Sequence, residues 1–216
     1  MGEVIQFVRR RQGARDRAAG VTFFFDLACP YTYLAAERLD RRFCDARWRP
    51  ATSGRHLAVS PLLAEAPGAG EVDLHALRAV ERRARELHMP LVWPERFPAQ
   101  VPHAMRAATF AAERGRAQAF AIAVGRLAFC GGFDVEDPRM LAEAAAAAGL
   151  DVDDTLDAAD DPRRDRELET AGRALWVDGG TTLPAVRHDG GLFCGEHGVT
   201  AAIFALPAVV TAGPGS

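Results

Sequence analysis

Lysine and asparagine are absent from this 216-residue sequence, and all 26 of its Lys and Arg positions are arginines. Without lysine, the chain has no P-loop lysine for nucleotide phosphates and no amine that could form a Schiff base with pyridoxal phosphate. Serine occurs only at positions 53, 60 and 216, and none of these lies in the G-x-S-x-G motif of hydrolases. These absences exclude P-loop nucleotide binding, pyridoxal phosphate chemistry and this type of serine hydrolase.

Cysteine and histidine are scarce and widely spaced. The cysteines stand at positions 29, 44, 130 and 194, so the sequence has no C-x-x-C pair. Zinc knuckles and dithiol redox motifs both need that spacing. The six histidines are scattered too, without an H-x-x-x-H pair, and no metal site is expected. In a reducing cytosol the cysteines are expected to be free thiols.

The chain also lacks a strong charge of one sign and long apolar runs. Its net charge is −3 and its pI is near 6.1, so the chain lacks the excess of basic residues that is typical of nucleic-acid-binding proteins. No apolar run reaches the roughly 18 residues that a membrane span needs. Five arginines lie between residues 9 and 17, but no apolar run of signal-peptide length follows them. We therefore expect a cytoplasmic protein whose residues 1–20 form a flexible Arg-rich leader.

The stretch VTFFFDLACPYTYLAAERL predicts a buried strand, a tight turn and a helix. Residues 21–25 are apolar and rich in β-formers, as in a strand that is buried on both faces. Residues 26–28 form the turn, Cys29 stands at the start of the helix, and Pro30 occupies the first helical position, where its missing N–H costs nothing. The polar positions predicted to face away from the core are Glu37, Arg38 and Arg41.

The predicted position of Cys29 favours a reactive thiol. The first N–H groups of a helix have no partners within the helix and carry about half a positive charge, which favours an anion. A thiol placed there has a lowered pKa, so that more of it is thiolate, the reactive form. The alternative interpretation is a small buried residue that packs under the turn, since free cysteines are often buried.

Strands are predicted at both ends of the chain, with only helices between them. The further strands cover residues 45–51, 183–188 and 191–194, and the last two are joined by a hairpin turn at Asp189–Gly190. The further helices cover residues 72–88, 103–130 with breaks or bends near Gly115 and Gly125, 137–149, 151–161, 163–177 and 197–206. The inward positions of the helix at 72–88 are Leu74, Leu77, Val80, Ala84 and Leu87.

The segment DLACPYTYLA resembles the active-site start of the DsbA-type thioredoxin superfamily. It is most similar to the branch of 2-hydroxychromene-2-carboxylate isomerases and kappa-class glutathione transferases, whose pattern is D-x-x-S-P-Y-S-Y-L-A. Cys29 takes the place of that serine, which is also the place of the attacking cysteine in DsbA oxidoreductases. Thr32 stands where the dithiol enzymes have their second cysteine. On this resemblance, Cys29 and Thr32 are the candidate catalytic residues.

The resemblance covers residues 21–206 and implies an α/β, thioredoxin-like fold with an all-helical insertion domain (DsbA-like). Residues 21–56 and 171–207 would form the thioredoxin-like domain, and residues 57–170 the helical insertion domain. Two segments of the insertion, ERRARELHMPLVWPERFP and PHAMRAATFAA, resemble the family's charged helix with its proline-rich connector and the helix that follows.

The segment GGTTLPAV resembles the family's G-V-P-T-F stretch. This likeness implies that Pro184 is cis and that the backbone of Leu183 lies beside Cys29, where it would pair with the backbone of a thiol substrate. The alternative is a trans proline at the start of a strand, a position where proline is tolerated.

Two more positions follow from the resemblance. FCGEHGV is similar to the family's F-W-G-x-D-R-L segment, which helps to hold the γ-glutamyl end of glutathione, and Glu196 and His197 occupy the matching positions. His197 replaces the usual aspartate. Gln100 stands where many relatives have the asparagine of F-P-x-N, and it is a candidate hydrogen-bonding partner of a bound thiol. The other cysteines, at positions 44, 130 and 194, are expected to be structural.

Three functions stay open. The first is a monothiol oxidoreductase that acts through Cys29 and forms a mixed disulfide with a small thiol or a protein thiol, which a second thiol then resolves. The second is an isomerase or transferase that depends on glutathione or another low-molecular thiol and encloses an apolar, aromatic substrate. The third is a non-catalytic binding module on the same fold. Relatives in this branch are often homodimers, and neither nucleic acid nor a membrane is expected as a partner.

Overall fold

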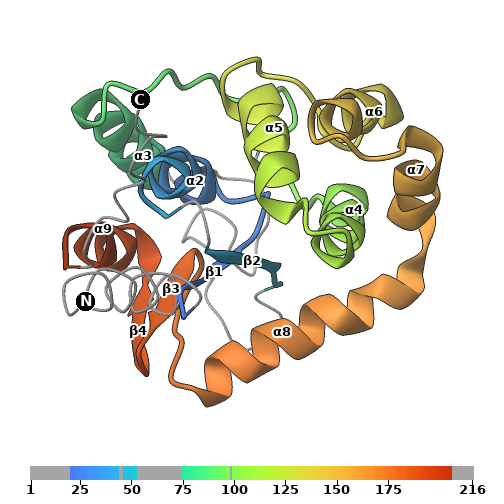
Figure 1. Cartoon of the computed structure of the whole chain (residues 1–216). Helices are drawn as coiled ribbons and strands as arrows, with labels where there is room; N and C mark the ends of the chain where they lie inside the picture. The colour runs from blue at the N-terminus through green and yellow to red at the C-terminus, as the bar shows by residue number, and fades with distance from the viewer. Residues whose placement is uncertain (1–19, 44–45, 53–73, 98, 206–216) are drawn as a thin grey trace, which may run out of the picture.

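A four-stranded sheet forms the centre of the computed structural model, which describes residues 20–43, 46–52, 74–97 and 99–205 (Figure 1). The strands are β1 (Thr22–Phe25), β2 (Arg47–Pro50), β3 (Ala185–His188) and β4 (Gly191–Cys194). The helices around them are α2 (Pro30–Arg42), α3 (Leu74–Glu86), α4 (Pro102–Glu113), α5 (Ala117–Phe129), α6 (Pro138–Ala147), α7 (Val152–Asp160), the 3-10 turn η1 (Pro162–Arg164), α8 (Asp165–Val177) and α9 (Gly195–Ala205). Each predicted strand and helix within the described residues is present, with the predicted helix over 103–130 divided into α4 and α5.

The strands are ordered β2-β1-β3-β4. β1 and β2 are parallel, so the chain must cross over between them, and α2 makes this crossover. β3 runs antiparallel to β1, and β4 antiparallel to β3. The predicted hairpin turn at Asp189–Gly190 is confirmed, with both residues at positive φ. The sheet therefore combines a β-α-β unit from one end of the chain with a β-β-α unit from the other.

Alternate residues of β1 face opposite sides of the sheet. Phe24 packs in a small cluster with Ala171 and Leu175 of α8, while Phe23 and Phe25 belong to the main core. Figure 1 shows α8 along one side of the sheet and α2 and α9 on the other. β1 is thus covered on both faces, which explains its unbroken run of apolar residues.

The helix predicted over residues 103–130 was expected to break or bend at two glycines, and the structure has a break at one of them. Gly115, at a φ of +68°, separates α4 from α5 as expected. Gly125 does not break a helix, so the predicted break there is wrong. It lies inside α5, where a Cβ atom would be 3.4 Å from Cδ2 of Tyr33. A Cβ atom would therefore just touch α2, and the space beyond it is filled by Tyr33, a contact that local sequence does not reveal.

Two predictions about helix faces are also wrong. Glu37 of α2 is buried, and its carboxylate accepts two hydrogen bonds from Arg126 of α5 at 2.5 and 2.9 Å. Arg38 is half-buried and bonds to Glu196 of α9, because helices cover both flanks of α2. In α3, the predicted core residue Leu74 is 63% exposed. The residues of α3 that are fully buried are Val80 and Ala84.

Several sequence predictions lie wholly or partly outside the described residues. They concern the leader at 1–20, the surroundings of Cys44, and the domain boundaries at 56/57 and 207. The boundary predicted at 170/171 lies inside α8. No helix in the described ranges is both long and apolar enough to cross a bilayer. Cys29, Cys130 and Cys194, the three cysteines within those ranges, are free.

The packing of Gly125 against Tyr33 predicts opposite effects of small and large replacements. Gly125→Ala is expected to raise the free energy of unfolding by up to about 1 kcal/mol, because alanine favours helix and 3.4 Å is an ordinary contact distance. Gly125→Val is expected to lower it by about 1–3 kcal/mol through overpacking. Urea denaturation measures both, and Gly115→Ala, which places a side chain at positive φ, serves as a destabilised reference. Equal stability of the two Gly125 variants would contradict the close packing of α2 and α5.

Candidate functional site

The turn after β1 places Cys29 at the start of α2, as predicted. The backbone N–H of Cys29 donates to the carbonyl of Asp26 at 3.1 Å, and the N–H of Ala28 donates to Oδ1 of the same aspartate at 2.9 Å. Cys29 is the N-cap residue in extended conformation, and Pro30 begins the helix. The backbone N–H of Thr32 donates to the carbonyl of Cys29 at 2.9 Å. The turn is therefore closed by its own backbone and by one carboxylate.

The thiol of Cys29 is protonated near neutral pH, contrary to the prediction from its position. No part of Cys29 is exposed to solvent. Burial raises the pKa of the thiol to about 12, and the nearby Asp26 adds to this increase. The N–H groups of Thr32 and Tyr31 and the Thr32 hydroxyl act in the opposite direction, but their effect on the pKa is smaller. The prediction of a lowered pKa is wrong because desolvation outweighs the helix terminus.

Thr32 presents an unused hydrogen-bonding group at the same place. Its side chain is 2% exposed, and its hydroxyl has no hydrogen-bond partner. The hydroxyl lies near enough to Cys29 to favour the thiolate, yet Cys29 makes no side-chain hydrogen bond that caps the helix. A buried hydroxyl without a hydrogen-bond partner lowers the stability of the fold unless a bound ligand accepts the hydrogen bond. Cys29 and Thr32 are thus two neighbouring groups that can each donate a hydrogen bond.

Asp26 is a second buried acid in the turn. It is 3% exposed, and burial raises the pKa of its carboxyl to about 6, although the N–H of Ala28 favours the charged form. Apart from its place in the D-x-x-S pattern, no feature of the sequence marks this residue as part of the site. In the structure, it is a titratable group near the Cys29 thiol and affects the pKa of that thiol.

The bend at Leu183 and Pro184 lies at the same edge of the sheet as Cys29. Their peptide bond is cis, the geometry that the resemblance implied. Ala185 pairs with Phe24 in the antiparallel register, so the residues just before β3 lie beside the end of β1 from which the turn leaves. Both residues of the bend are buried, and the carbonyl of Pro184 accepts a hydrogen bond from Gly195 at 2.8 Å.

Glu196 and His197 have very different environments. One carboxylate oxygen of Glu196, Oε1, accepts hydrogen bonds from Arg38 at 2.8 Å and Thr200 at 2.9 Å and pairs with Arg83 at 2.9 Å. The other oxygen, Oε2, is buried and has no hydrogen-bond partner. His197 is fully exposed, with its Nδ1 at 3.8 Å from that oxygen. Glu196 therefore joins α2, α3 and α9 and retains one free acceptor, whereas His197 lies on the surface.

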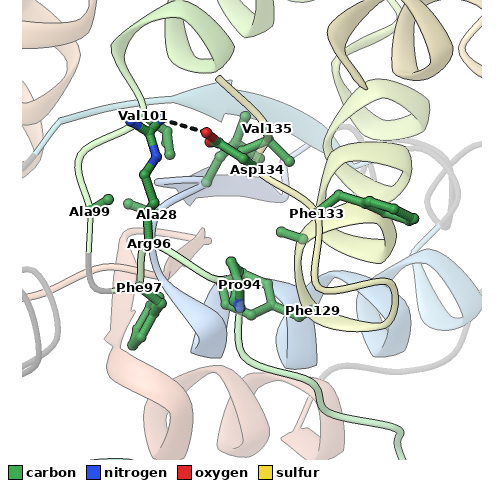
Figure 2. Close-up of a pocket in the computed structure, with 12 residues that line it drawn as sticks. Ala28, Pro94, Arg96, Phe97, Ala99, Val101, Phe129, Phe133, Asp134 and Val135 are labelled. Atoms are coloured by element: carbon green, nitrogen blue, oxygen red, sulfur yellow. Dashed lines mark ion pairs between the residues drawn. The ribbon is translucent and has the colours of Figure 1, made fainter. Parts of the chain in front are cut away.

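A pocket that sequence analysis did not find begins at the residues that precede Cys29. It is a small cavity of about 30 Å³ that opens to solvent, between the turn, the connector before α4 and the segment after α5 (Figure 2). The lining residues are Leu27, Ala28, Pro94, Arg96, Phe97, Ala99, Val101, Ala128, Phe129, Phe133, Asp134 and Val135. The proline-rich connector was recognised in the sequence, but its proximity to the turn depends on the tertiary fold.

Gln100 does not line this pocket, although both of its neighbours do. Its side chain is exposed. The structure therefore places Thr32 beside Cys29 and the bend at 183–184 at the end of β1 from which the turn leaves, whereas Gln100 is not among the residues that line the pocket. Among the residues that the structure describes, no group of three or more His, Cys, Asp or Glu side chains is placed to hold a metal ion.

Comparisons with known proteins identify the fold. The family described as DSBA-like thioredoxin domain matches residues 20–196. Three solved structures superpose on most of the chain: 2-hydroxychromene-2-carboxylate isomerase (16% identity, 86% of this chain and 93% of that chain, TM-score 0.65), a probable DsbA oxidoreductase from Streptomyces coelicolor (22%, 86% and 87%, 0.66), and the cytosolic disulfide reductase DsbM from Pseudomonas aeruginosa with GSH (17%, 80% and 87%, 0.57). No curated protein sequence matches the chain. At these identities the structural likeness shows the fold.

The environment of Cys29 predicts a protected thiol. Its alkylation by iodoacetamide is expected to be at least tenfold slower than that of the half-buried Cys130 and Cys194 near pH 7, because only the thiolate reacts and burial disfavours it. Mass spectrometry of the separate peptides measures each rate, and unfolded protein gives the reference rate for each cysteine. Fast alkylation of Cys29 in the folded protein, with a midpoint near neutral pH, would contradict this assignment.

Because the carboxyl of Asp26 is buried, its replacement by an amide is expected to raise the free energy of unfolding in a pH-dependent way. Because the folded-state pKa is raised from 3.8 to about 6, the folded protein holds this proton more tightly, and stability falls as pH rises from about 4 to above 6. Asp26→Asn is expected to stabilise the protein by up to about 3 kcal/mol near pH 8 and to have little effect near pH 4. Urea denaturation at both pH values measures the difference. The exposed Asp157→Asn is the matched control, and an equal effect in the two variants would argue against the role of burial.

Proposed function

The chain belongs to the DSBA-like thioredoxin domain family, and from this premise we propose that it is a thiol-dependent isomerase or transferase. In this proposal a bound low-molecular thiol, glutathione or a similar compound, is the chemical agent, and Cys29 holds it. The observation that carries the proposal is the state of Cys29: it is protonated and fully buried at a helix terminus. Such a group donates a hydrogen bond more readily than it attacks a disulfide.

The groups around Cys29 suit the binding of an anionic sulfur. The Cys29 S–H can donate, the Thr32 hydroxyl has no other partner, and the N-terminus of α2 favours negative charge. The bound thiol would supply a nucleophile that adds to a conjugated carbonyl compound, allows the resulting single bond to rotate, and then leaves unchanged. The role of Cys29 and Thr32 is to keep that sulfur ionised and oriented. A serine at position 29 would serve the same purpose, as in the branch that the sequence resembles.

Glu196 is the residue proposed to bind the amino group of the thiol compound. Its Oε2 is a buried acceptor without a hydrogen-bond partner, which fits an ammonium group. Tyr31, next to the Cys29–Pro30 step, is close enough to Glu196 and Cys29 for both to raise the pKa of its phenol, after burial as the main cause. The backbone of Leu183 is the further expected contact, whereas His197 and Gln100 have no such support. The structure of DsbM with GSH is that of a protein with the same fold that binds this tripeptide.

The pocket beside the turn supports an apolar substrate. Leu27 and Ala28, which directly precede Cys29, form part of its wall, and Phe97 and Phe129 lie opposite with their rings at a T-shaped 6.0 Å. Concave sites with mostly apolar walls are typical of small-molecule binding. An aromatic, conjugated substrate would thus lie close to the bound sulfur. The neighbour named 2-hydroxychromene-2-carboxylate isomerase has a substrate of this kind in its name.

A monothiol oxidoreductase is the second candidate. The N–H groups of Tyr31 and Thr32 lower the pKa of the Cys29 thiol, which is the arrangement that a thiolate leaving group needs. Like the first function, this one requires an opening of the site, because the Cys29 sulfur is fully buried. It is ranked second because its sulfur must also ionise, which burial disfavours.

Replacement of Cys29 separates these functions. The assay follows binding of glutathione by calorimetry and the glutathione-dependent conversion of 2-hydroxychromene-2-carboxylate. Cys29→Ser is expected to keep both within about tenfold, because a hydroxyl still donates, and Cys29→Ala is expected to lower kcat/KM by about 10- to 100-fold through loss of a charge-assisted hydrogen bond.

The other outcomes identify the alternatives. Loss of thiol–disulfide exchange in both variants, with no glutathione-dependent isomerisation in the wild type, would support the oxidoreductase. Equal behaviour of the wild type and both variants would leave Cys29 without a chemical role and favour a binding module. Circular dichroism of each variant serves as the control for folding.

A further inference from the structure

A second cavity lies at the open edge of the sheet. β2 is an edge strand, and it packs against α4, α5 and α8 (Figure 1). The cavity beside β2 has a volume of about 520 Å³ and opens to solvent. Its wall is made by β2, by the junction between α4 and α5, and by α8. It shares no residue with the turn after β1 or with the pocket that begins at Leu27 and Ala28.

The wall of this cavity contains a buried hydrogen-bond donor without a partner, the indole N–H of Trp48. Trp48 is 5% exposed, and its ring packs edge-on against Phe23 with the ring centroids 4.7 Å apart. Its Nε1 atom is buried and has no hydrogen-bond partner. Buried polar groups are normally hydrogen-bonded. Because Trp48 lines the cavity, a ligand held there can accept this hydrogen bond.

The N-terminus of α5 borders the same cavity through Ala117 and Gln118. The N-cap residue is Arg116, which makes no side-chain cap, and no acidic residue stands in the first turn. The N–H of Phe120 donates to the carbonyl of Arg116 at 3.0 Å. Among the residues that the structure describes, the N–H groups of Ala117 and Gln118 have no partner. The positive end of this helix is therefore not balanced by a group of the helix itself.

Two arginines of β2 add positive charge to the wall. Arg47 and Arg49 are two positions apart, so their side chains leave the same face of the strand. Within the described part of the chain, neither guanidinium has a hydrogen bond or an ion pair. The carboxylates of the wall are Glu113, which binds Arg164 at 2.9 Å, and the exposed Glu167. The cationic groups thus exceed the carboxylates once the pair of Glu113 and Arg164 is set aside.

We propose that this cavity binds the phosphate group of a small phosphate monoester. A phosphate has several acceptor oxygens, so it can take hydrogen bonds from the indole, the helix terminus and the two guanidinium groups together. Helix N-termini are common phosphate sites in proteins. The volume is within the range of small-molecule sites and leaves room for the organic part of the ester. This site is independent of the proposed function, because Cys29 takes no part in it.

Titration of the ¹⁵N-labelled full chain with phenyl phosphate tests the site. The chain has three tryptophans, and a ¹H–¹⁵N correlation spectrum gives a separate indole signal for each. At about pH 7.5, where a phosphate monoester is mostly a dianion, phenyl phosphate is expected to shift the Trp48 signal saturably. The expected Kd is below about 1 mM. The signal of Trp93, whose indole already donates to Glu81 at 3.0 Å, is expected to stay in place. The loss of one signal in Trp48→Phe assigns the Trp48 resonance.

Charge variants localise the ligand. Arg47→Gln and Arg49→Gln are each expected to weaken the binding of phenyl phosphate by about tenfold, the effect of losing one hydrogen bond to a charged group. Glu167→Gln removes a repelling carboxylate and is expected to strengthen binding severalfold. Arg139, an exposed residue of α6 that does not line the cavity, provides the matched control. Arg139→Gln changes the net charge equally and is expected to bind as the wild type does.

Three results would overturn the inference: no saturable shift of the Trp48 signal at millimolar phenyl phosphate, equal losses of affinity in Arg49→Gln and Arg139→Gln, or equal affinities of the wild type for phenyl phosphate and benzoate. The wild type is expected to bind phenyl phosphate about tenfold more tightly than benzoate, which carries a single charge. Cys29→Ala is expected to bind phenyl phosphate as the wild type does. If the Trp48 signal shifts while the glutathione-dependent reaction is absent, the proposed function fails and the phosphate site stands.

Discussion

The burial of the Cys29 thiol at the start of α2 is the constraint on which the chemistry of this site depends. A helix N-terminus stabilises an anion by up to about 2 kcal/mol in partly buried geometry. The increase in the pKa of the thiol from 9.0 to about 12 corresponds to about 4 kcal/mol in favour of the neutral form, after the favourable N–H groups have been counted. Desolvation therefore decides the protonation state of Cys29, and this state is the basis of the role proposed for it as a hydrogen-bond donor.

The position of α2 depends on contacts with every neighbouring layer. The Tyr33 hydroxyl donates to the carbonyl of Pro90 at 2.9 Å and contacts Sγ of Cys130 at 3.0 Å, which connects the helix to the connector and to the end of α5. Glu37 binds Arg126 of α5, and Arg38 binds Glu196 of α9. The site is thus held from the helical region on one side and from the last helix on the other, so that Cys29 is placed by the whole fold.

The fold alone does not select a reaction, since the same scaffold occurs in proteins named as isomerases, oxidoreductases and disulfide reductases. In this chain the distinguishing features are local: a protonated thiol, a hydroxyl without a partner at Thr32, and an apolar pocket that starts at Ala28. The proposal of a site for a thiol and an apolar compound rests on these features. A site built for disulfide exchange would expose its sulfur and keep a second cysteine close to it.

Local sequence determined the β1–turn–α2 unit, the hairpin at Asp189–Gly190 and the cap at Asp137–Pro138, because each depends on residues within a few positions of one another. The family pattern added the place of Cys29 and of the bend at Pro184. Only the tertiary structure decided the burial of Cys29, the ion pairs of α2, the close packing at Gly125 and the pocket beside the turn. Desolvation and packing at these places are set by residues that are distant in sequence, so periodicity and spacing do not identify the partners.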